Sequence, residues 1–311
     1  MKFKYRNFTT LFAVLCFASC GKQEPIWTTE GLRAINGTKL YVKTIGRGEP
    51  MIVVHGGPGM SHDYFLPQMA ELAQDFNLIF YDHRVSGRSS ADVDSADVSL
   101  QMFLADIDGL REAFGLEKIN LLGHSWGGLL AMHYALAYPE RLKSLILSNP
   151  SPPRFEDVQE GNKIQMSRFT PEENHARQEL MQSEAFQNRD PAAIAEMFRL
   201  NFAASFFDKS LADSLTLSIP KDYGAKSGKL RFLGRDMQKL YSISNRLSEI
   251  SCPTLIIHGA YDSVPMRAVE EIAEQIEGAQ LEILKDCGHF PFIETPEPFF
   301  QRIRKFLSGV E

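Results

Sequence analysis

Several features are missing from this sequence, and each absence excludes a class of function. After the first few residues the chain has no basic run, and its net charge is −6 with a pI of about 5.8. Because phosphates repel an acidic surface, nucleic acid is excluded as a partner. Histidines and carboxylates show no ligand spacing such as His-Glu-x-x-His, so we expect no metal and no cofactor. The apolar run at 11–17 is far shorter than the ~20 residues of a membrane-spanning helix.

Cysteine is also scarce. The chain has four cysteines, and two of them, Cys16 and Cys20, lie near its N-terminus. Cys252 precedes one predicted strand, and Cys287 follows the next. If these strands are parallel, the two thiols lie at opposite ends of the sheet, roughly 20 Å apart at ~3.3 Å per residue. We therefore predict no disulfide bond.

Residues 1–19 have the pattern of a lipoprotein-type signal peptide. Basic side chains at positions 2, 4 and 6 precede the apolar stretch, and Ala18-Ser19 supplies small residues before Cys20. Residues 17–21 resemble a bacterial lipobox, which implies cleavage before Cys20 and lipidation of its thiol. We expect a protein exported to the bacterial cell envelope and anchored to a membrane by this lipid. The alternative is an ordinary secretory signal, which also takes the protein out of the cytoplasm.

The most informative motif is Gly-x-Ser-x-Gly at 123–127. An apolar stretch of strand character leads into it, and residues of helical spacing follow it directly. Strand, tight turn and helix in this order predict a nucleophile elbow, in which Ser125 is strained and its hydroxyl exposed. In such an elbow the backbones of the strand and the helix approach so closely that a Cβ at Gly123 or Gly127 would clash. Ser125 is therefore the predicted nucleophile.

A serine nucleophile needs a base and a group that orients the base. In α/β-hydrolases these partners follow in the order Asp or Glu, then His. Asp262 lies just past a predicted buried strand that starts near residue 254, and His289 lies in the loop after a strand at 281–284. Both residues come in the right order and each at a strand's carboxyl end. We predict the catalytic triad Ser125, Asp262 and His289.

The rest of the chain predicts a mostly parallel sheet with helices on both faces, that is, an α/β-hydrolase fold. At 311 residues with 44% hydrophobic composition, the chain can bury a substantial core. We expect a core in two parts, 20–150 and 251–311, separated by a helical cap at 151–250. The expected elements are a hairpin at Asn36-Gly37 between 32–35 and 38–45, strands at 51–54 and 77–82, a helix at 99–114, and cap helices at 171–187, 191–207 and 230–247.

Three segments together resemble the proline iminopeptidase family of α/β-hydrolases. They are His-Gly-Gly-Pro-Gly at 55–59, the loop at 81–89 and Gly-His-Ser-Trp-Gly-Gly at 123–128. The resemblance implies hydrolysis of an N-terminal residue, such as proline, from a short peptide. It also implies an oxyanion hole made by the backbone N–H groups of Gly57 and Trp126. His83 and Val85 depart from the family's usual pattern.

An exopeptidase must pair the substrate's ammonium group with carboxylates in its cap. Family members use cap glutamates for this purpose, and Glu196 is the clearest counterpart here, followed by the aromatic pair Phe206-Phe207. The family's usual Trp-Glu motif is absent.

We therefore predict a serine hydrolase that forms an acyl-enzyme on a short peptide or small acyl substrate, and the preferred activity is that of an aminopeptidase. Two alternatives stay open. The same core with another cap hydrolyses esters, lactones or carbon–carbon bonds. From a different class, the protein would be a catalytically silent, peptide-binding lipoprotein.

Overall fold

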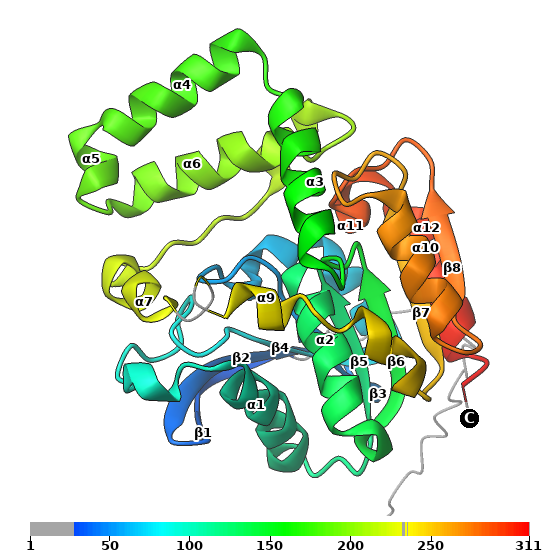
Figure 1. The fold of residues 1–311 in the computed structure, drawn as a ribbon. Coiled ribbons are helices and arrows are strands. Elements are labelled where there is room, and N and C mark those ends of the chain that lie inside the picture. Colours follow the sequence, from blue (N-terminus) through cyan, green and yellow to red (C-terminus); the bar gives the residue numbers. More distant parts are fainter. Residues whose placement is uncertain (1–27, 232–233, 235, 311) are drawn as a thin grey trace, which may run out of the picture.

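The computed structural model describes residues 28–231, 234 and 236–310 (Figure 1). The predicted signal peptide at 1–19 and the predicted lipidation site Cys20 lie outside these residues. Within the described part of the chain, no helix combines the length and the apolar character needed to cross a bilayer.

The fold begins with the predicted hairpin. Strands β1 (Thr28–Ile35) and β2 (Thr38–Ile45) pair antiparallel across a turn in which Asn36 and Gly37 have φ values of 46° and 75°. Positive φ at both central residues is what the Asn-Gly turn of a tight hairpin requires. The hairpin then joins the main sheet, because β2 pairs antiparallel with β4.

The eight strands form one sheet in the order β1-β2-β4-β3-β5-β6-β7-β8, and every pair from β4 to β8 is parallel. The remaining strands are β3 (Glu49–Val54), β4 (Phe76–Tyr81), β5 (Ile119–His124), β6 (Leu142–Ser148), β7 (Thr254–Gly259) and β8 (Gln280–Leu284). The predicted mostly parallel sheet is thus confirmed. Its parallel strands end at one edge, where the loops that carry Ser125, Asp262 and His289 begin.

Helices cover both faces of the sheet, as predicted. On β5, Leu121 and Leu122 belong to separate apolar clusters, because successive side chains of a strand point to opposite faces. One cluster includes residues of α1 (Leu100–Ala113), α2 (Trp126–Ala137) and α10 (Met266–Gln275). The other includes residues of α11 (Pro291–Glu294) and α12 (Pro296–Leu307).

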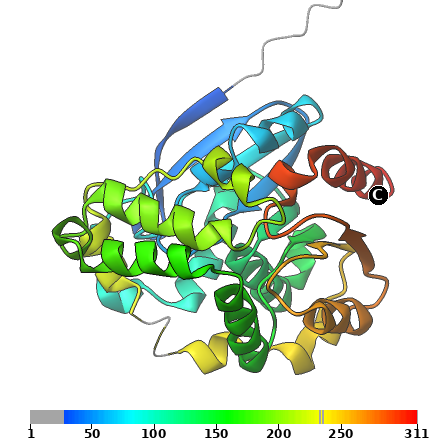
Figure 2. The ribbon, with the colours of Figure 1, turned by 90° about the horizontal axis from the view of Figure 1, so that it is seen from above.

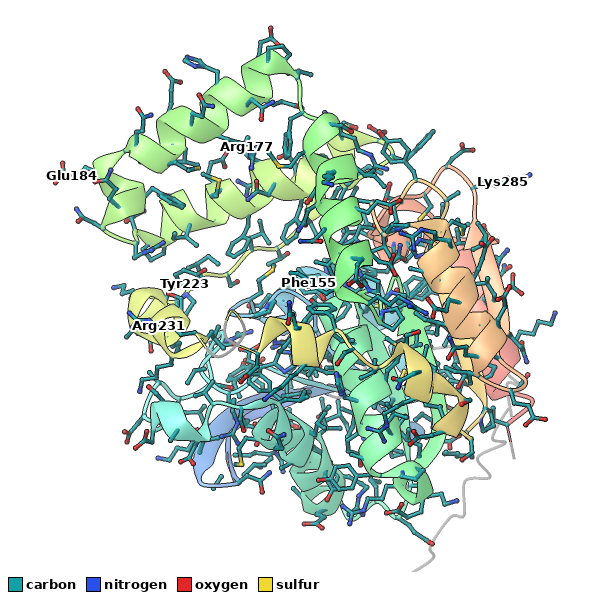
Figure 3. The ribbon with its side chains drawn as sticks, in the orientation of Figure 1. Phe155, Arg177, Glu184, Tyr223, Arg231 and Lys285 are labelled. Carbon is teal, nitrogen blue, oxygen red and sulfur yellow. The ribbon has the colours of Figure 1, made fainter. Side chains whose placement is uncertain are left out.

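Between β6 and β7 the chain forms a helical cap, which stands away from the sheet in Figure 1. Figure 2 shows α4 and α6 lying side by side across the molecule. On the facing sides of this pair, Arg177 of α4 donates a hydrogen bond to Asn201 of α6 over 2.9 Å (Figure 3). The cap helices are α3 (Phe155–Ser167), α4 (Pro171–Gln182), α5 (Glu184–Gln187), α6 (Pro191–Ala203) and α7 (Tyr223–Lys229).

Two predictions about the cap need correction. The predicted helix at 171–187 is broken at Ser183, which is extended and starts α5 as its N-cap. The predicted helix at 230–247 is wrong: the non-helical residues 241–243 separate the short α9 (Met237–Leu240) from a 3₁₀ helix at Ser244–Glu249. Its apolar residues Leu240 and Leu247 are buried against the core from these separate turns, so tertiary packing overrides the helical spacing.

Helix α3 was not predicted, because its sequence is polar and contains Gly161. Close packing favours that glycine, because a Cβ at Gly161 would lie 3.0 Å from the carbonyl oxygen of Ser263. The cap therefore contacts the loop that follows β7, directly beside Asp262.

Candidate functional site

Ser125 lies in the sharp turn between β5 and α2. Its φ and ψ values of 57° and −124° place it in a strained region for a residue with a side chain. A Cβ at Gly123 would lie 2.4 Å from the carbonyl oxygen of Gly127, and one at Gly127 would lie 2.2 Å from that of Val54. Both glycines are therefore required by the close approach of the two backbones, which confirms the predicted elbow.

Asp262 and His289 lie on the loops after β7 and β8 and face each other. The Nδ1–H of His289 donates to Oδ2 of the buried Asp262 over 2.8 Å. Burial alone would raise the pKa of Asp262, but the facing histidine outweighs it and holds this pKa well below its usual range. Burial would likewise lower the pKa of His289, but the carboxylate of Asp262 raises it above its ordinary value. Since Nδ1 carries the proton, Nε2 of neutral His289 is left as the acceptor.

Asn149, which follows β6, completes the support of Asp262. Its side-chain amide donates to Oδ2 of Asp262 over 2.6 Å and to the carbonyl oxygen of Gly288 over 3.0 Å. The backbone N–H of Val264 donates to the other carboxylate oxygen over 3.2 Å. Asn149 was missed in the sequence, although its place after a strand's carboxyl end was a usable signal.

The side chains of Ser125 and His289 meet at two adjoining pockets. One pocket of about 200 Å³ lies under the cap and is lined by residues of α3 and α6, among them Asp157 and Phe202. The other, of about 60 Å³, is mainly apolar and is lined by Gly57, Met60, Tyr64, Phe202 and Phe290 together with the two catalytic candidates. No hydrogen bond joins Ser125 to His289 among the described residues. Such bonds are often long in the absence of substrate and tighten when it binds.

The loop at 55–59 passes directly against Ser125. A Cβ at Gly56 would lie 2.7 Å from Cβ of Ser125, so only glycine fits there. Gly57 has a φ of 60° and lines the small pocket. Trp126 is the first residue of α2, where a helix leaves N–H groups without intrahelical partners. The predicted pairing of these two amides around an oxyanion stays a prediction.

A buried hydrogen-bond chain connects this loop to the histidine loop. The N–H of Gly56 donates to the hydroxyl of Tyr64 (2.6 Å), and that hydroxyl bonds Nδ1 of His124 (2.8 Å). Nε2 of His124 bonds the carbonyl oxygen of His289 (2.8 Å). Burial lowers the pKa of His124 to about 3, so its ring is neutral, with the proton on Nε2 and Nδ1 accepting from Tyr64. Tyr64 and His124 were not singled out in the sequence.

The departures from the family pattern at 83 and 85 are both buried. The ring of His83 lies 3.8 Å from that of His55 and meets Trp126 edge to face at 5.4 Å. Val85 has a φ of 52°, a conformation that glycine adopts without strain. His83 thus packs beneath the residue that follows the nucleophile.

Glu196 does not reach the pockets at Ser125. Its side chain on α6 is 46% exposed and forms an ion pair with Arg199 over 2.5 Å. Among the described residues, Asp157 of α3 is the carboxylate-bearing residue that lines the larger pocket, and its buried side chain forms an ion pair with Arg267. The first turn of α3, which also carries Phe155, lies where the cap meets the core (Figure 3).

Cys252 and Cys287 are free and buried. Within residues 28–231, 234 and 236–310, no group of three or more His, Cys, Asp or Glu side chains is arranged to hold a metal ion.

The model of the α/β hydrolase fold family matches residues 49–296. A proline iminopeptidase of Heyndrickxia coagulans is 29% identical over 295 residues, which cover 91% of this chain and 99% of that protein. One of Lactobacillus delbrueckii subsp. bulgaricus is 30% identical, with coverages of 90% and 97%. Among solved structures, a thermophilic esterase of Thermogutta terrifontis has a TM-score of 0.66 and 26% identity, covering 91% of this chain and 99% of that one.

Proposed function

This chain belongs to the α/β-hydrolase fold family, and on that premise we propose that it is a serine aminopeptidase releasing N-terminal proline or a similar small residue from short peptides. One observation carries the proposal: His289, oriented by Asp262, lines the same pockets as Ser125 on its strained turn. The homology to proline iminopeptidases supports the peptide substrate.

In the proposed mechanism, Oγ of Ser125 attacks the carbonyl carbon of the first peptide bond while Nε2 of His289 takes its proton. Asp262 stabilises the resulting imidazolium, and the N–H groups of Gly57 and Trp126 bind the oxyanion. His289 then protonates the leaving amine, which departs with the rest of the peptide. Water, deprotonated by His289, hydrolyses the acyl-enzyme and restores the Ser125 hydroxyl.

The small apolar pocket supports a small acyl residue. A bound water needs ~10–15 Å³ on this measure, so about 60 Å³ holds roughly four to six groups of that size. Its size and apolar lining suit a five-membered ring such as that of proline. The peptide beyond the first residue would extend into the larger pocket beneath α3 and α6.

An aminopeptidase must also pair the substrate's ammonium group. We propose Asp157 for this role, because it lines the larger pocket, and Glu196 as the second candidate, by its place in the cap, although it lines neither pocket. Both are already paired with arginines, Arg199 and Arg267. This pairing favours a second candidate function, hydrolysis of uncharged esters or related acyl compounds, and the similarity to an esterase at 26% identity supports it.

The deciding experiment compares proline arylamide, the same arylamide with its nitrogen acetylated, and a short acyl ester. Cleavage of the proline arylamide with its free amine alone supports the aminopeptidase, and turnover of the ester alone supports the second candidate. Ser125→Ala should abolish either activity while leaving the thermal unfolding transition in place. A Ser125→Ala protein that retains turnover would rule out the mechanism, and a wild-type protein that no fluorophosphonate labels would favour a silent binding module.

The same substrates identify the amine site. Asp157→Asn and Glu196→Gln each remove one negative charge from the cap. The variant that loses proline arylamide turnover but keeps ester turnover carries the proposed contact, and the other serves as its control. If both variants keep the arylamide activity, neither carboxylate binds the amine.

We further propose that the protein is exported and anchored to a membrane of the bacterial cell envelope through lipid on Cys20. The support is the sequence pattern of residues 1–21 alone. Metabolic labelling with a palmitate analogue, compared between wild type and Cys20→Ser, tests this proposal. Equal labelling of the two proteins would contradict it.

A further inference from the structure

The loop that carries His289 is held through its backbone. The carboxylate oxygen Oε1 of Glu294, on α11, accepts hydrogen bonds from the N–H groups of Gly288 (3.0 Å) and Phe290 (3.2 Å), the two neighbours of His289. The N–H of His289 itself donates to the carbonyl oxygen of Ser205 over 2.8 Å. Three successive backbone amides around the proposed base are thus bonded to groups outside the loop.

Glu294 also bonds the cap. Its second oxygen, Oε2, accepts the N–H of Phe207 over 2.7 Å, just after α6. The contact between the two segments is close, because a Cβ at Gly288 would lie 2.1 Å from the carbonyl oxygen of Ser205. Beside it, the rings of Phe206 and Phe290 stack at 4.7 Å. One carboxylate therefore joins the histidine loop to the base of the cap.

From this geometry we infer that Glu294 is a positioning residue, which fixes His289 and makes its placement depend on the docking of the cap segment 205–207. The inference rests on the proposed function, in which His289 is the general base. The carboxylate accepts three N–H bonds and donates none, which favours its ionised form and opposes the burial that raises its pKa above the usual value. Misplacing a catalytic group by about 1 Å costs about 100-fold in rate, so such a support affects kcat.

The charge of Glu294 also affects a measurable quantity, the pKa of His289, which a purely structural role would leave unchanged. The largest effect on the pKa of His289 is burial, which lowers it, and the next is Asp262, which raises it. The carboxylate of Glu294 adds a smaller raising effect. Other titratable or charged groups packed around this site come from β5, β7 and the cap: His124, His258 and Arg168, the last donating to the carbonyl oxygen of Asp262 over 3.2 Å. Removing the charge of Glu294 alone should therefore lower the pKa of His289.

The test compares Glu294→Gln, Glu294→Asp and the control Glu297→Gln, using ester and arylamide hydrolysis from pH 5 to 9. In wild type, both Oε1 and Oε2 of Glu294 accept backbone N–H groups. In Glu294→Gln the side-chain NH₂ replaces one of these oxygens, so a donor faces a donor and at least one hydrogen bond is lost. We expect kcat to fall about 10- to 100-fold with little change in KM, and the acid limb of kcat/KM to move to lower pH. Glu294→Asp keeps the charge but is too short to bridge loop and cap, so kcat should fall while the acid limb stays in place.

Glu297→Gln removes a carboxylate from the exposed side of α12, where it accepts only from Gln301 in the described part of the chain, and should behave like wild type. Unchanged kcat and an unchanged acid limb in Glu294→Gln would overturn the inference. If that variant does not fold, unchanged kcat in Glu294→Asp overturns it instead. Fluorophosphonate labelling of Ser125 in wild type distinguishes failure of the inference about Glu294 from failure of the proposed function. If wild type is labelled and active and Glu294→Gln behaves like wild type, only the inference is refuted. If wild type is unlabelled and inactive, the proposed function itself is refuted.

Discussion

Replacing Tyr64 with Phe tests the buried hydrogen-bond chain that connects three loops of the site. The substitution keeps the ring, which packs at 4.4 Å from Phe65 and at 5.5 Å from His124, and removes only the hydroxyl. Two buried groups then lose their partner, the N–H of Gly56 and Nδ1 of His124. Burial raises the pKa of Tyr64, so the lost group is a protonated hydroxyl at every pH of the assay.

The size of the effect follows from these two orphaned groups. Leaving a buried donor or acceptor unpaired costs about 1–3 kcal/mol, so the pair costs about 2–6 kcal/mol of unfolding free energy. For a domain of this size, that corresponds to a fall in Tm of roughly 5–15 °C. Gly56 precedes Gly57, the proposed oxyanion donor. Loss of a whole donor costs about 10²–10³ in kcat, so a loosened one should cost about 10- to 100-fold.

Scanning calorimetry and ester hydrolysis measure the two effects. The control is Tyr138→Phe, at the far end of α2, because the Tyr138 hydroxyl makes no hydrogen bond with the residues that the structure describes. A Tyr64→Phe protein whose Tm falls by less than about 2 °C and whose kcat stays within about twofold would refute the reasoning. The buried hydrogen-bond chain through Tyr64 would then contribute neither to stability nor to the placement of Gly57.

Two further predictions concern acid stability and thiol reactivity. Burial lowers the pKa of His55 from 6.5 to about 4 and that of His124 from 6.5 to about 3, so the unfolded chain binds more protons in this window. Stability should therefore decrease as pH falls below 6.5, by up to about 1.4 kcal/mol per pH unit for each histidine, and a Tm that is flat from pH 7 to 5 would contradict this. Burial also raises the pKa of Cys252, and that of Cys287 to about 12, so in protein lacking residues 1–20 both thiols should react with Ellman's reagent only after denaturation. A fast-reacting thiol in that native protein would be the contrary result.

The elements predicted with the greatest success are those whose signals are local. The Asn36-Gly37 hairpin needs only two residues that accept positive φ, and its turn has this geometry. The elbow needs glycines at 123 and 127 and a strand that runs into a helix, all of which lie within about 20 consecutive residues. The predictions failed in the cap, where Leu240 and Leu247 have helical spacing but are buried from two separate short turns.

The same division holds for the site. Ser125, Asp262 and His289 were singled out from the sequence as candidates because each follows a strand, and parallel strands bring their carboxyl ends to one edge. The sequence could not show that Glu196 lines neither pocket at Ser125, since a glutamate on an amphipathic helix has no local sign of its orientation. Nor could it single out Glu294, whose three N–H partners come from residues 4, 6 and 87 positions away.

By itself, the sequence therefore determined the class of fold and singled out the candidate nucleophile and the order of its candidate partners, because these depend on backbone geometry and on the period of apolar residues. Only the tertiary structure decided how the cap sits on the histidine loop, which carboxylates reach the pockets, and how Tyr64 and His124 connect the loops. The physical reason is that hydrogen bonds and close packing between distant segments depend on side-chain directions that are set only when the helices and the sheet pack together.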